Sequence, residues 1–380
     1  MLPPTLRLTI LRRLSFLPEP ALQALRSASI LGSGFSLTDL ATVTGRPAVD
    51  LSVMLGEAIS ARMLEDDGLR LRFRHELIRD AIYQDLAGSV RRALHREAGQ
   101  RLARAGAPAL QVAEHLARGA RTGDTEAVTW LARAARQAAA RSPEVAADLL
   151  GQAAGLMAPG DPGRDRLLAE RASSLMWAGR IADAEAACRS LLGRDHDRSV
   201  EGTVRVCLGN VLLAGGQARD GLCELEQACQ SPLLTGAERA EALAWASMAS
   251  LVLADLDGAA AAAAQARSVA VAARDPLATS VAMGSLALVY EVRGDHGGTR
   301  RAAHAHLRAA DRGRHPVPGA VRLQPAAIGC ARRRRCGGGD QGHRAAARGR
   351  WLHWPDGPGV RRPPGGSRGP HALDPVAADL

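Results

Sequence analysis

The chain has 380 residues, of which 46% are hydrophobic and 3% aromatic, and its formal net charge is +10. All 49 basic residues are arginines, so the sequence cannot hold a P-loop, because that motif places a lysine beside the nucleotide phosphates. No apolar run reaches the ~18 residues of a membrane span, and no signal-peptide pattern is visible. The six cysteines form no C-x-x-C pair, so we expect a protein of the reducing cytoplasm that does not contact a membrane.

The positive charge is concentrated near the C-terminus. Residues 297–380 carry 16 arginines and five aspartates, whereas residues 1–296 carry 33 arginines and 34 acidic residues. Phosphate contacts need an excess of cations, so DNA binding by the nearly neutral first part is not expected.

The first predicted elements are helices with one apolar face. Residues 18–31 form the first, and a short helix follows that Ser36 or Thr38 caps and Gly45 ends. A third helix is predicted from apolar residues at helical spacing, which are Val49, Val53, Leu55, Ile59 and Met63.

The period then changes from helical to alternating around Asp66-Asp67-Gly68, where Asp-Gly is a strong signal for a β-hairpin. One face of the second strand is apolar and carries Leu69, Leu71 and Phe73. The other face is basic and carries Arg70, Arg72 and Arg74. Three helices followed by a hairpin predict a winged helix.

The domain organisation follows from these patterns. Helices at about 75–87 and 89–104 complete a winged-helix-like domain at 1–105, and 106–123 reads as a linker. Residues 124–296 form helical hairpins, the first at about 124–157 with Ser142-Pro143 at its turn. Later turns recur at spacings of about 36 to 42 residues, at Gly179-Arg180, Gly215-Gly216, Asp257-Gly258 and Gly294-Asp295. The predicted fold is therefore mainly α, with an α-solenoid of tetratricopeptide-like hairpins after the winged helix.

The helical pattern ends abruptly at residue 297. Residues 297–380 contain 15 glycines and nine prolines but no glutamate, and such a segment buries too little apolar area to offset its ordering entropy. We predict a disordered tail, and we hypothesise that it is read out of frame from GC-rich DNA.

Several segments resemble the middle of large ATP-binding regulators of the LuxR family, which are signal-transduction ATPases. The resemblance covers about residues 5–296 and is carried by Leu11–Leu14, Ala28–Gly32, Phe73–Tyr83, Arg91–His95 and Val112–Leu116. It implies an ATPase domain before the winged helix, a helical-repeat sensor after it and a C-terminal helix-turn-helix that binds promoters. The chain shows neither a P-loop nor a recognisable helix-turn-helix, so ATP hydrolysis and promoter binding are not carried over.

His75 is the candidate site residue that the resemblance implies. In related switch ATPases a winged-helix histidine approaches the nucleotide phosphates, so His75 would sense nucleotide state in an intact parent protein. The alternative is a histidine that only makes local hydrogen bonds. The run from His75 to Arg79 lacks the second histidine of the zinc motif H-E-x-x-H, so no metal site is predicted.

Two other groups of residues are candidates for an interaction surface. Arg70, Arg72 and Arg74 form a basic strip that we expect to face a neighbouring domain. Trp177, Trp245 and Tyr290 recur in the first helices of the hairpins, where they line a ligand groove or, in the alternative, fill the core of the repeats.

These patterns predict a protein that acts by binding and switching and is not an enzyme. No cofactor is expected for this chain, and the resemblance implies ATP only for an intact parent protein. We expect a fragment of a LuxR-family transcriptional regulator whose repeats bind a protein or small-molecule signal. One alternative is a standalone tetratricopeptide-like scaffold for partner proteins. Another is nucleic-acid binding through the arginine-rich tail, which would weaken steeply with ionic strength.

Overall fold

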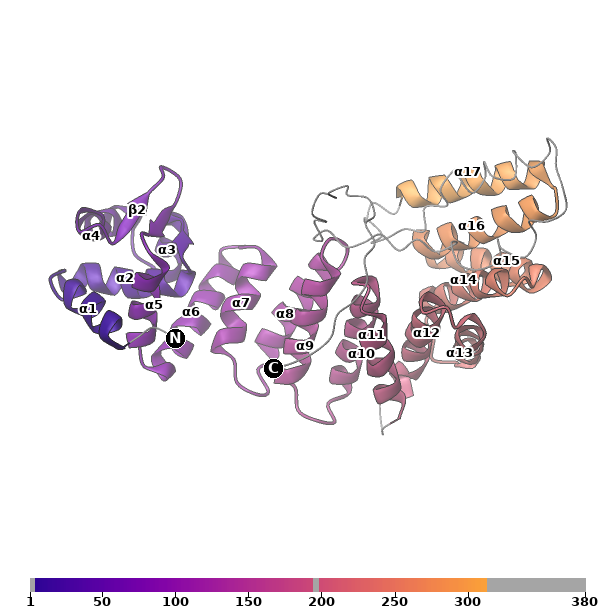
Figure 1. The fold of residues 1–380 in the computed structure, drawn as a ribbon, viewed down its shortest axis with the longest axis horizontal. Helices are drawn as coiled ribbons and strands as arrows, with labels where there is room; N and C mark the ends of the chain where they lie inside the picture. Colours follow the sequence, from indigo (N-terminus) through magenta and orange to yellow (C-terminus); the bar gives the residue numbers. More distant parts are fainter. Residues whose placement is uncertain (1–3, 194–197, 313–380) are drawn as a thin grey trace, which may run out of the picture. The chain divides into compact units, whose positions relative to one another are not determined.

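A computed structural model describes residues 4–193 and 198–312, and this part of the chain is almost entirely helical (Figure 1). Seventeen helices and three short strands occur in it, which confirms the predicted mainly α fold. All described residues fall within one compact unit. The predicted disorder or frameshift of residues 313–380 lies outside the described residues and stays a prediction.

The first elements form a helical unit with a small sheet, which we call the N-terminal unit. Its elements are α1 (Pro4–Leu14), α2 (Glu19–Leu31), β1 (Gly34–Phe35), α3 (Leu37–Thr44), α4 (Ala48–Ser60), β2 (Leu64–Asp66), β3 (Leu71–Phe73) and α5 (Glu76–Asp85). The antiparallel sheet has the order β1-β3-β2, so β3 is central. The sequence did not predict β1, whose Phe35 packs at 6.0 Å from the Phe73 ring.

The core of the N-terminal unit corrects two predicted apolar faces. Helix α4 buries Leu51, Leu55 and Ala58, whereas Val49 and Val53 are 73% and 72% exposed on its other side. Of the five predicted residues, Leu55 and Met63 are buried and Ile59 packs against the core, so the prediction was wrong only at Val49 and Val53. Spacing alone did not distinguish the two sets of apolar residues on this helix.

Leu69 was also predicted on the apolar strand face, but its side chain is 89% exposed. The reason is that Leu69 lies in the turn before β3, where the Asp67 carboxylate accepts hydrogen bonds from its backbone N–H and from that of Arg70.

Two helices connect the N-terminal unit to the hairpins, α6 (Gly88–Arg104) and α7 (Ala109–Gly119). Helix α7 occupies most of the segment 106–123 that was predicted to be a linker, so that prediction needs correction. The segment is helical because Val112, Ala113 and Leu116 recur at helical spacing and are all buried.

Ten helices follow as consecutive pairs, which Figure 1 shows from α8 onward. They are α8 (Thr125–Ala138), α9 (Pro143–Leu156), α10 (Pro162–Trp177), α11 (Ile181–Leu192), α12 (Arg198–Ala214), α13 (Ala218–Gln230), α14 (Gly236–Val252), α15 (Leu256–Ala273), α16 (Pro276–Val292) and α17 (His296–Arg312). Helices that follow each other pack together, and α10, α12, α14 and α16 also pack along the series. The described residues therefore form stacked helical hairpins.

The turns between these helices agree with the predicted glycines at three positions. Gly179, Gly216 and Gly294 have φ of 78°, 82° and 78°, values that L side chains rarely adopt. The turn predicted at Asp257-Gly258 is misplaced, because both residues lie in the first turn of α15. The chain reverses earlier, where Ala254 takes φ 63° and the Asp255 carboxylate caps α15 by accepting from the Gly258 N–H.

Helix α17 corrects the predicted start of the tail at residue 297. The Asp295 carboxylate accepts a hydrogen bond from the Gly298 N–H at 2.8 Å and so caps the helix. Ala302 is buried in a cluster with Met283 and Leu286 of α16. The last hairpin is thus completed within the segment whose glycine content predicted irregular structure.

None of the helices in residues 4–193 and 198–312 combines the length and the apolar character that a membrane crossing requires.

Candidate functional site at the junction of α5, α6 and α7

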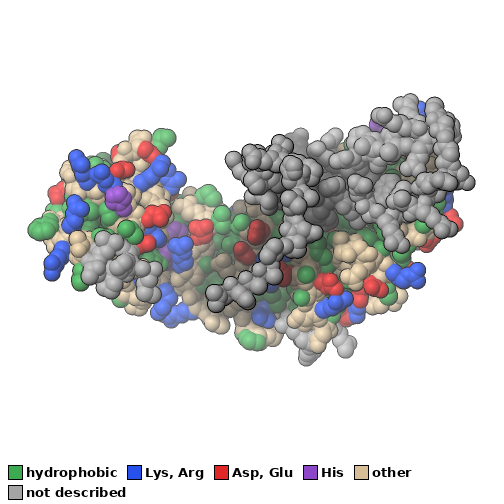
Figure 2. Space-filling view, viewed as in Figure 1, with side chains coloured by type: hydrophobic (Ala, Val, Ile, Leu, Met, Phe, Trp, Pro, Cys, Tyr) green, Lys and Arg blue, Asp and Glu red, His purple; other side chains and the backbone are tan. Residues whose placement is uncertain are grey.

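The basic hairpin residues lie together but are largely neutralised. Arg72 pairs with Asp67 at 2.6 Å, and Arg74 pairs with Glu65 at 3.6 Å. Arg70 donates a hydrogen bond to the Gly34 carbonyl at 3.0 Å. Figure 2 shows acidic and basic side chains mixed over the visible face of the N-terminal unit. The role of these arginines as an interaction surface stays a prediction.

His75 immediately precedes α5, with an extended backbone and an exposed side chain that makes no capping hydrogen bond. It does not lie with Trp177, Trp245 or Tyr290, which belong to α10, α14 and α16. The proposed role of His75 in sensing a nucleotide is not tested by its position.

The predicted aromatic residues are mostly part of the repeat core. Trp245 is 7% exposed within a hydrophobic cluster, and the Trp177 ring packs at 6.5 Å from it. Tyr290 is half-buried against the cluster of Met283 and Leu286. These contacts agree with the alternative in which the aromatic residues fill the core of the repeats. They leave the Trp245 ring inaccessible to a surface ligand.

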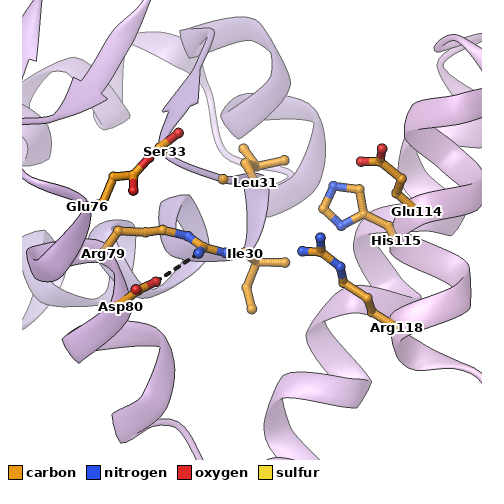
Figure 3. Close-up of a pocket in the computed structure, with 10 residues that line it drawn as sticks. Ile30, Leu31, Ser33, Glu76, Arg79, Asp80, Glu114, His115 and Arg118 are labelled. Atoms are coloured by element: carbon orange, nitrogen blue, oxygen red, sulfur yellow. Dashed lines mark hydrogen bonds and ion pairs between the residues drawn. The ribbon is translucent and has the colours of Figure 1, made fainter. Parts of the chain in front are cut away.

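A cavity of about 310 Å³ lies where the N-terminal unit meets α7 (Figure 3). Its walls are the end of α2, the first half of α5 and the middle of α7. His115 and Arg118 point from α7 across this space toward Ile30 and Leu31 of α2. The cavity therefore joins side chains of the N-terminal unit to those of the first helix that packs on the hairpins.

Arg79 fixes α5 against α2 at this cavity. Its Nε donates to the Ser29 carbonyl at 3.1 Å, and its Nη1 pairs with Asp80 at 3.0 Å (Figure 3). The Arg79 side chain is only 20% exposed, so its guanidinium group is held by fixed partners.

A hydrogen-bonded chain connects α5, α6 and α7, and we call its three residues, Tyr83, His95 and His115, the junction triad. The Tyr83 hydroxyl lies 3.0 Å from His95 Nε2, and His95 Nδ1 lies 3.1 Å from His115 Nδ1. The residues come from α5, α6 and α7 in turn. His95 is 1% exposed and His115 is 6% exposed, so the two imidazole rings are shielded from water, whereas Tyr83 is half-buried.

The environment of the triad keeps both rings neutral. Burial, the larger cause, and the charges of His115, Arg118, Arg79 and Arg91 together lower the pKa of His95 to about 3. Burial and, to a smaller extent, the charge of Arg118 lower the pKa of His115 to about 4, against a small opposing effect of Asp39. Two neutral imidazoles can share the Nδ1–Nδ1 contact because one ring donates while the other accepts.

Close packing of α6 on α7 brings the two histidines into contact. A Cβ atom on Gly119 would lie 2.8 Å from the Arg96 backbone nitrogen and 2.9 Å from the Arg92 carbonyl oxygen. A Cβ atom on Gly99 would lie 2.7 Å from the Leu116 side chain. Only glycine permits this separation of the helices, so the two glycines set the geometry of the triad.

A second cavity, of about 580 Å³, is lined by residues of α5, α6 and α7, among them Tyr83 and His95 of the triad. Four arginines line it, from all three helices, and they are Arg79, Arg91, Arg92 and Arg118. The Arg79 and Arg91 guanidinium groups each lie 5.1 Å from the centre of the Tyr83 ring, an arrangement typical of cation–π contacts. Arg79 and Arg118 line both cavities, so the two spaces share a basic wall.

Sequence reasoning missed the junction triad, although all three residues lie in segments that carry the family resemblance. The signal that could have found them is a polar ring on the buried face of each helix. His115 stands among Val112, Ala113 and Leu116, and His95 stands four residues before the buried Gly99. A histidine in such a position needs a buried partner.

Several solved structures match the chain, among them one of low sequence identity. No protein-family model matches the chain, and no curated protein matches it. The structure is a Signal Transduction ATPase with Numerous Domains (STAND) protein with a tetratricopeptide repeat sensor, from Pyrococcus horikoshii. The two sequences are 12% identical, the TM-score is 0.40, and the match covers 79% of this chain and 52% of that one. The chain thus spans about half the length of the structure that it matches.

Proposed function

We propose that this chain is the coupling and sensing part of a LuxR-family ATP-binding transcriptional regulator. In this proposal a winged helix passes on a conformational state, and tetratricopeptide-like hairpins bind a protein or small-molecule signal. The order of elements from α2 to β3, with a three-stranded antiparallel sheet of order β1-β3-β2, supports the winged-helix assignment. The stacked hairpins from α8 to α17 support the sensor assignment, because such stacks provide extended binding surfaces.

The observation that carries the proposal is the junction triad. Helix α5 packs on α1, α2 and β3, whereas α7 packs on α8, the first helix of the hairpins. Tyr83, His95 and His115 connect these two neighbourhoods through one part-buried and one buried hydrogen bond. If α7 moved away from α6, buried ring nitrogens would lose their partners at a cost of roughly 1–3 kcal/mol each. We therefore expect α5, α6 and α7 to move as one body.

The mechanism is binding and switching without bond chemistry. A signal bound to the hairpins would change the position of α7, and the triad would carry that change to α5 and the small sheet. Coupling of this kind requires a continuous set of contacts that both ends can bias, and the triad supplies one.

A double-mutant cycle tests this coupling. Tyr83 and His115 contact each other only through His95, so we expect Tyr83→Phe and His115→Leu to interact by at least ~0.5 kcal/mol in the free energy of unfolding. The matched control pairs Tyr83→Phe with Glu114→Gln, an exposed neighbour on α7, and should be additive within ~0.3 kcal/mol. Additivity in both cycles would contradict coupling through the triad.

The DNA that flanks the coding sequence tests the family assignment separately. A reading frame with a P-loop upstream, or one with a helix-turn-helix downstream, is the expected result for a LuxR-type regulator. Flanking DNA with neither would contradict that assignment and favour the standalone scaffold.

A further inference from the structure

The second cavity at the junction carries an excess of positive charge. Its lining includes Arg79, Arg91, Arg92 and Arg118, and the one acidic residue in that lining is Asp80. Asp80 already pairs with Arg79. In the described part of the chain, Arg91, Arg92 and Arg118 form no ion pair with another residue. The cavity therefore presents three guanidinium groups that form no ion pair with a carboxylate of residues 4–193 and 198–312.

The helix that contributes Arg91 and Arg92 adds a second source of positive potential. Helix α6 is 17 residues long, and Gly88, its first residue, also lines the cavity. Ala87 at its N-cap position provides no side-chain hydrogen bond to the first turn of α6. The N-terminus of a helix favours anions, and here it adjoins the arginine cluster.

Two of the arginines are held in place before any ligand arrives. Arg79 and Arg91 lie against the Tyr83 ring, and Arg91 also donates to the Tyr83 carbonyl at 3.3 Å. The Tyr83 hydroxyl is in turn hydrogen-bonded to the buried His95. Fixed donors lose less conformational entropy when they bind a ligand than free arginine side chains do.

We propose that this cavity binds a small molecule that carries a phosphate or diphosphate group, held by Arg91, Arg92 and Arg118. Guanidinium groups match the oxygens of phosphate with paired N–H donors, and several arginines can share its two or more negative charges. The volume of about 580 Å³ is that of a small-molecule site. Binding depends on the arginines alone, whereas a role as the signal of the regulator rests on the proposed function.

The site also has a physical route to the rest of the protein. A phosphate group between Arg118 of α7 and Arg91 of α6 would tie these helices together beside the triad. The ligand would thus strengthen the contact that joins the N-terminal unit to the hairpins, and its removal would weaken that contact.

Isothermal titration of the full chain with inorganic pyrophosphate tests the proposal. We compare wild type with Arg91→Gln/Arg118→Gln and with a control, Arg104→Gln/Arg141→Gln, that removes the same two charges from exposed positions outside the cavity. The cavity variant should bind at least ~10-fold more weakly than wild type, and the control should stay within about twofold. The variant Arg91→Lys/Arg118→Lys keeps both charges, so its affinity for pyrophosphate should lie between those of the cavity variant and the control. Circular dichroism checks that each variant is folded.

The proposal is overturned if wild type does not bind pyrophosphate, or if the control loses as much affinity as the cavity variant. The second result would mean that net charge, including that of the arginine-rich C-terminal segment, accounts for the binding. Citrate and inorganic phosphate serve as comparison ligands, and citrate binding as tight as pyrophosphate binding would contradict recognition of phosphate. The double-mutant cycle needs no ligand, so failure here leaves the test of coupling intact.

Discussion

At the scale of single residues, the two histidines of the junction triad make the stability of the fold sensitive to pH. His95 and His115 are buried beside three arginines, and burial is the main reason that their pKa values are lowered. The sequence motif pointed to His75, which is exposed in the structure. The buried pair instead forms by contact between two helices, and its members, His95 and His115, are 20 residues apart in the sequence. Such contacts leave no pattern of spacing in a sequence, so this part of the site was not predicted.

The first prediction concerns stability against acid. The unfolded chain binds a proton at each of these histidines below pH ~6.5, but the folded chain does so only near pH 3 to 4, so stability falls as the pH drops through this window. At pH 5 each histidine accounts for a loss of about 2 kcal/mol relative to pH 7.5. In urea unfolding, the variant His95→Leu/His115→Leu should therefore lose less stability between pH 7.5 and pH 5 than wild type does.

The control for this measurement is His75→Gln, which changes an exposed histidine. This variant should lose as much stability on acidification as wild type does. Glu241, whose pKa burial raises to about 7, titrates in every variant and cancels in the comparison. An undiminished pH dependence in the double leucine variant would show that the buried pair is not the cause.

The second prediction concerns the close contact of α6 and α7. Gly119→Ala places a methyl group 2.8 Å from the backbone nitrogen of Arg96, so the helices must separate at a cost of roughly 1–3 kcal/mol in stability. Gly155→Ala is the matched control, because nothing lies within 4 Å of the new Cβ atom in α9, and it should stabilise by about 0.5–1 kcal/mol. Thermal unfolding measures both, and a neutral Gly119→Ala would contradict the packing described.

At the scale of elements, helices with one clear apolar face could be predicted from the sequence, whereas the buried face of a helix with apolar residues on both sides could not. The hairpins from α8 to α16 follow from their periodicity and from turn glycines such as Gly179 and Gly216. Helix α7 was read as a linker because its 11 residues stand between loops, although its buried residues follow helical spacing. The prediction for α4 was right at Leu55 and wrong at Val49 and Val53, because apolar residues lie on both sides of that helix.

The third prediction belongs to α14, which begins with a capping box. The Thr235 side chain accepts from the Glu238 N–H, and the Glu238 carboxylate accepts from the Thr235 N–H at 2.9 Å. Thr235→Ala should lower the free energy of unfolding by ~1 kcal/mol. The control Thr129→Ala removes an exposed hydroxyl in the middle of α8 and should change it by less than ~0.5 kcal/mol. Equal effects of the two changes would rule out a stabilising cap.

At the scale of the whole molecule, the stack of hairpins ends later than composition indicated. The last pair holds together through Ala302 against α16 and through His306, whose Nδ1 lies 3.0 Å from the Ser280 hydroxyl. Helix α17 was missed because His296, Gly297 and Gly298 at its start are poor helix formers, and tertiary packing overrides that preference.

The fourth prediction compares two shortened chains. A chain that ends at residue 295 exposes the surface of α16 around Met283 and Leu286, whereas a chain that ends at residue 312 keeps it covered. We expect proteolysis within α16 to be faster in the shorter chain, because an uncapped end of a helical stack opens more often. Equal rates of cleavage would mean that α17 does not protect the stack.

Hydrogen–deuterium exchange of His115→Leu, read peptide by peptide, tests most directly whether the junction triad couples the N-terminal unit to the hairpins. Glu114→Gln, an exposed change on the same helix, is the matched control and should exchange like wild type. If the triad couples the two parts, loss of the Nδ1–Nδ1 hydrogen bond should speed exchange in α5 and α8 as well as in α7. Faster exchange confined to α7 would contradict the coupling and leave the two histidines as a local packing feature.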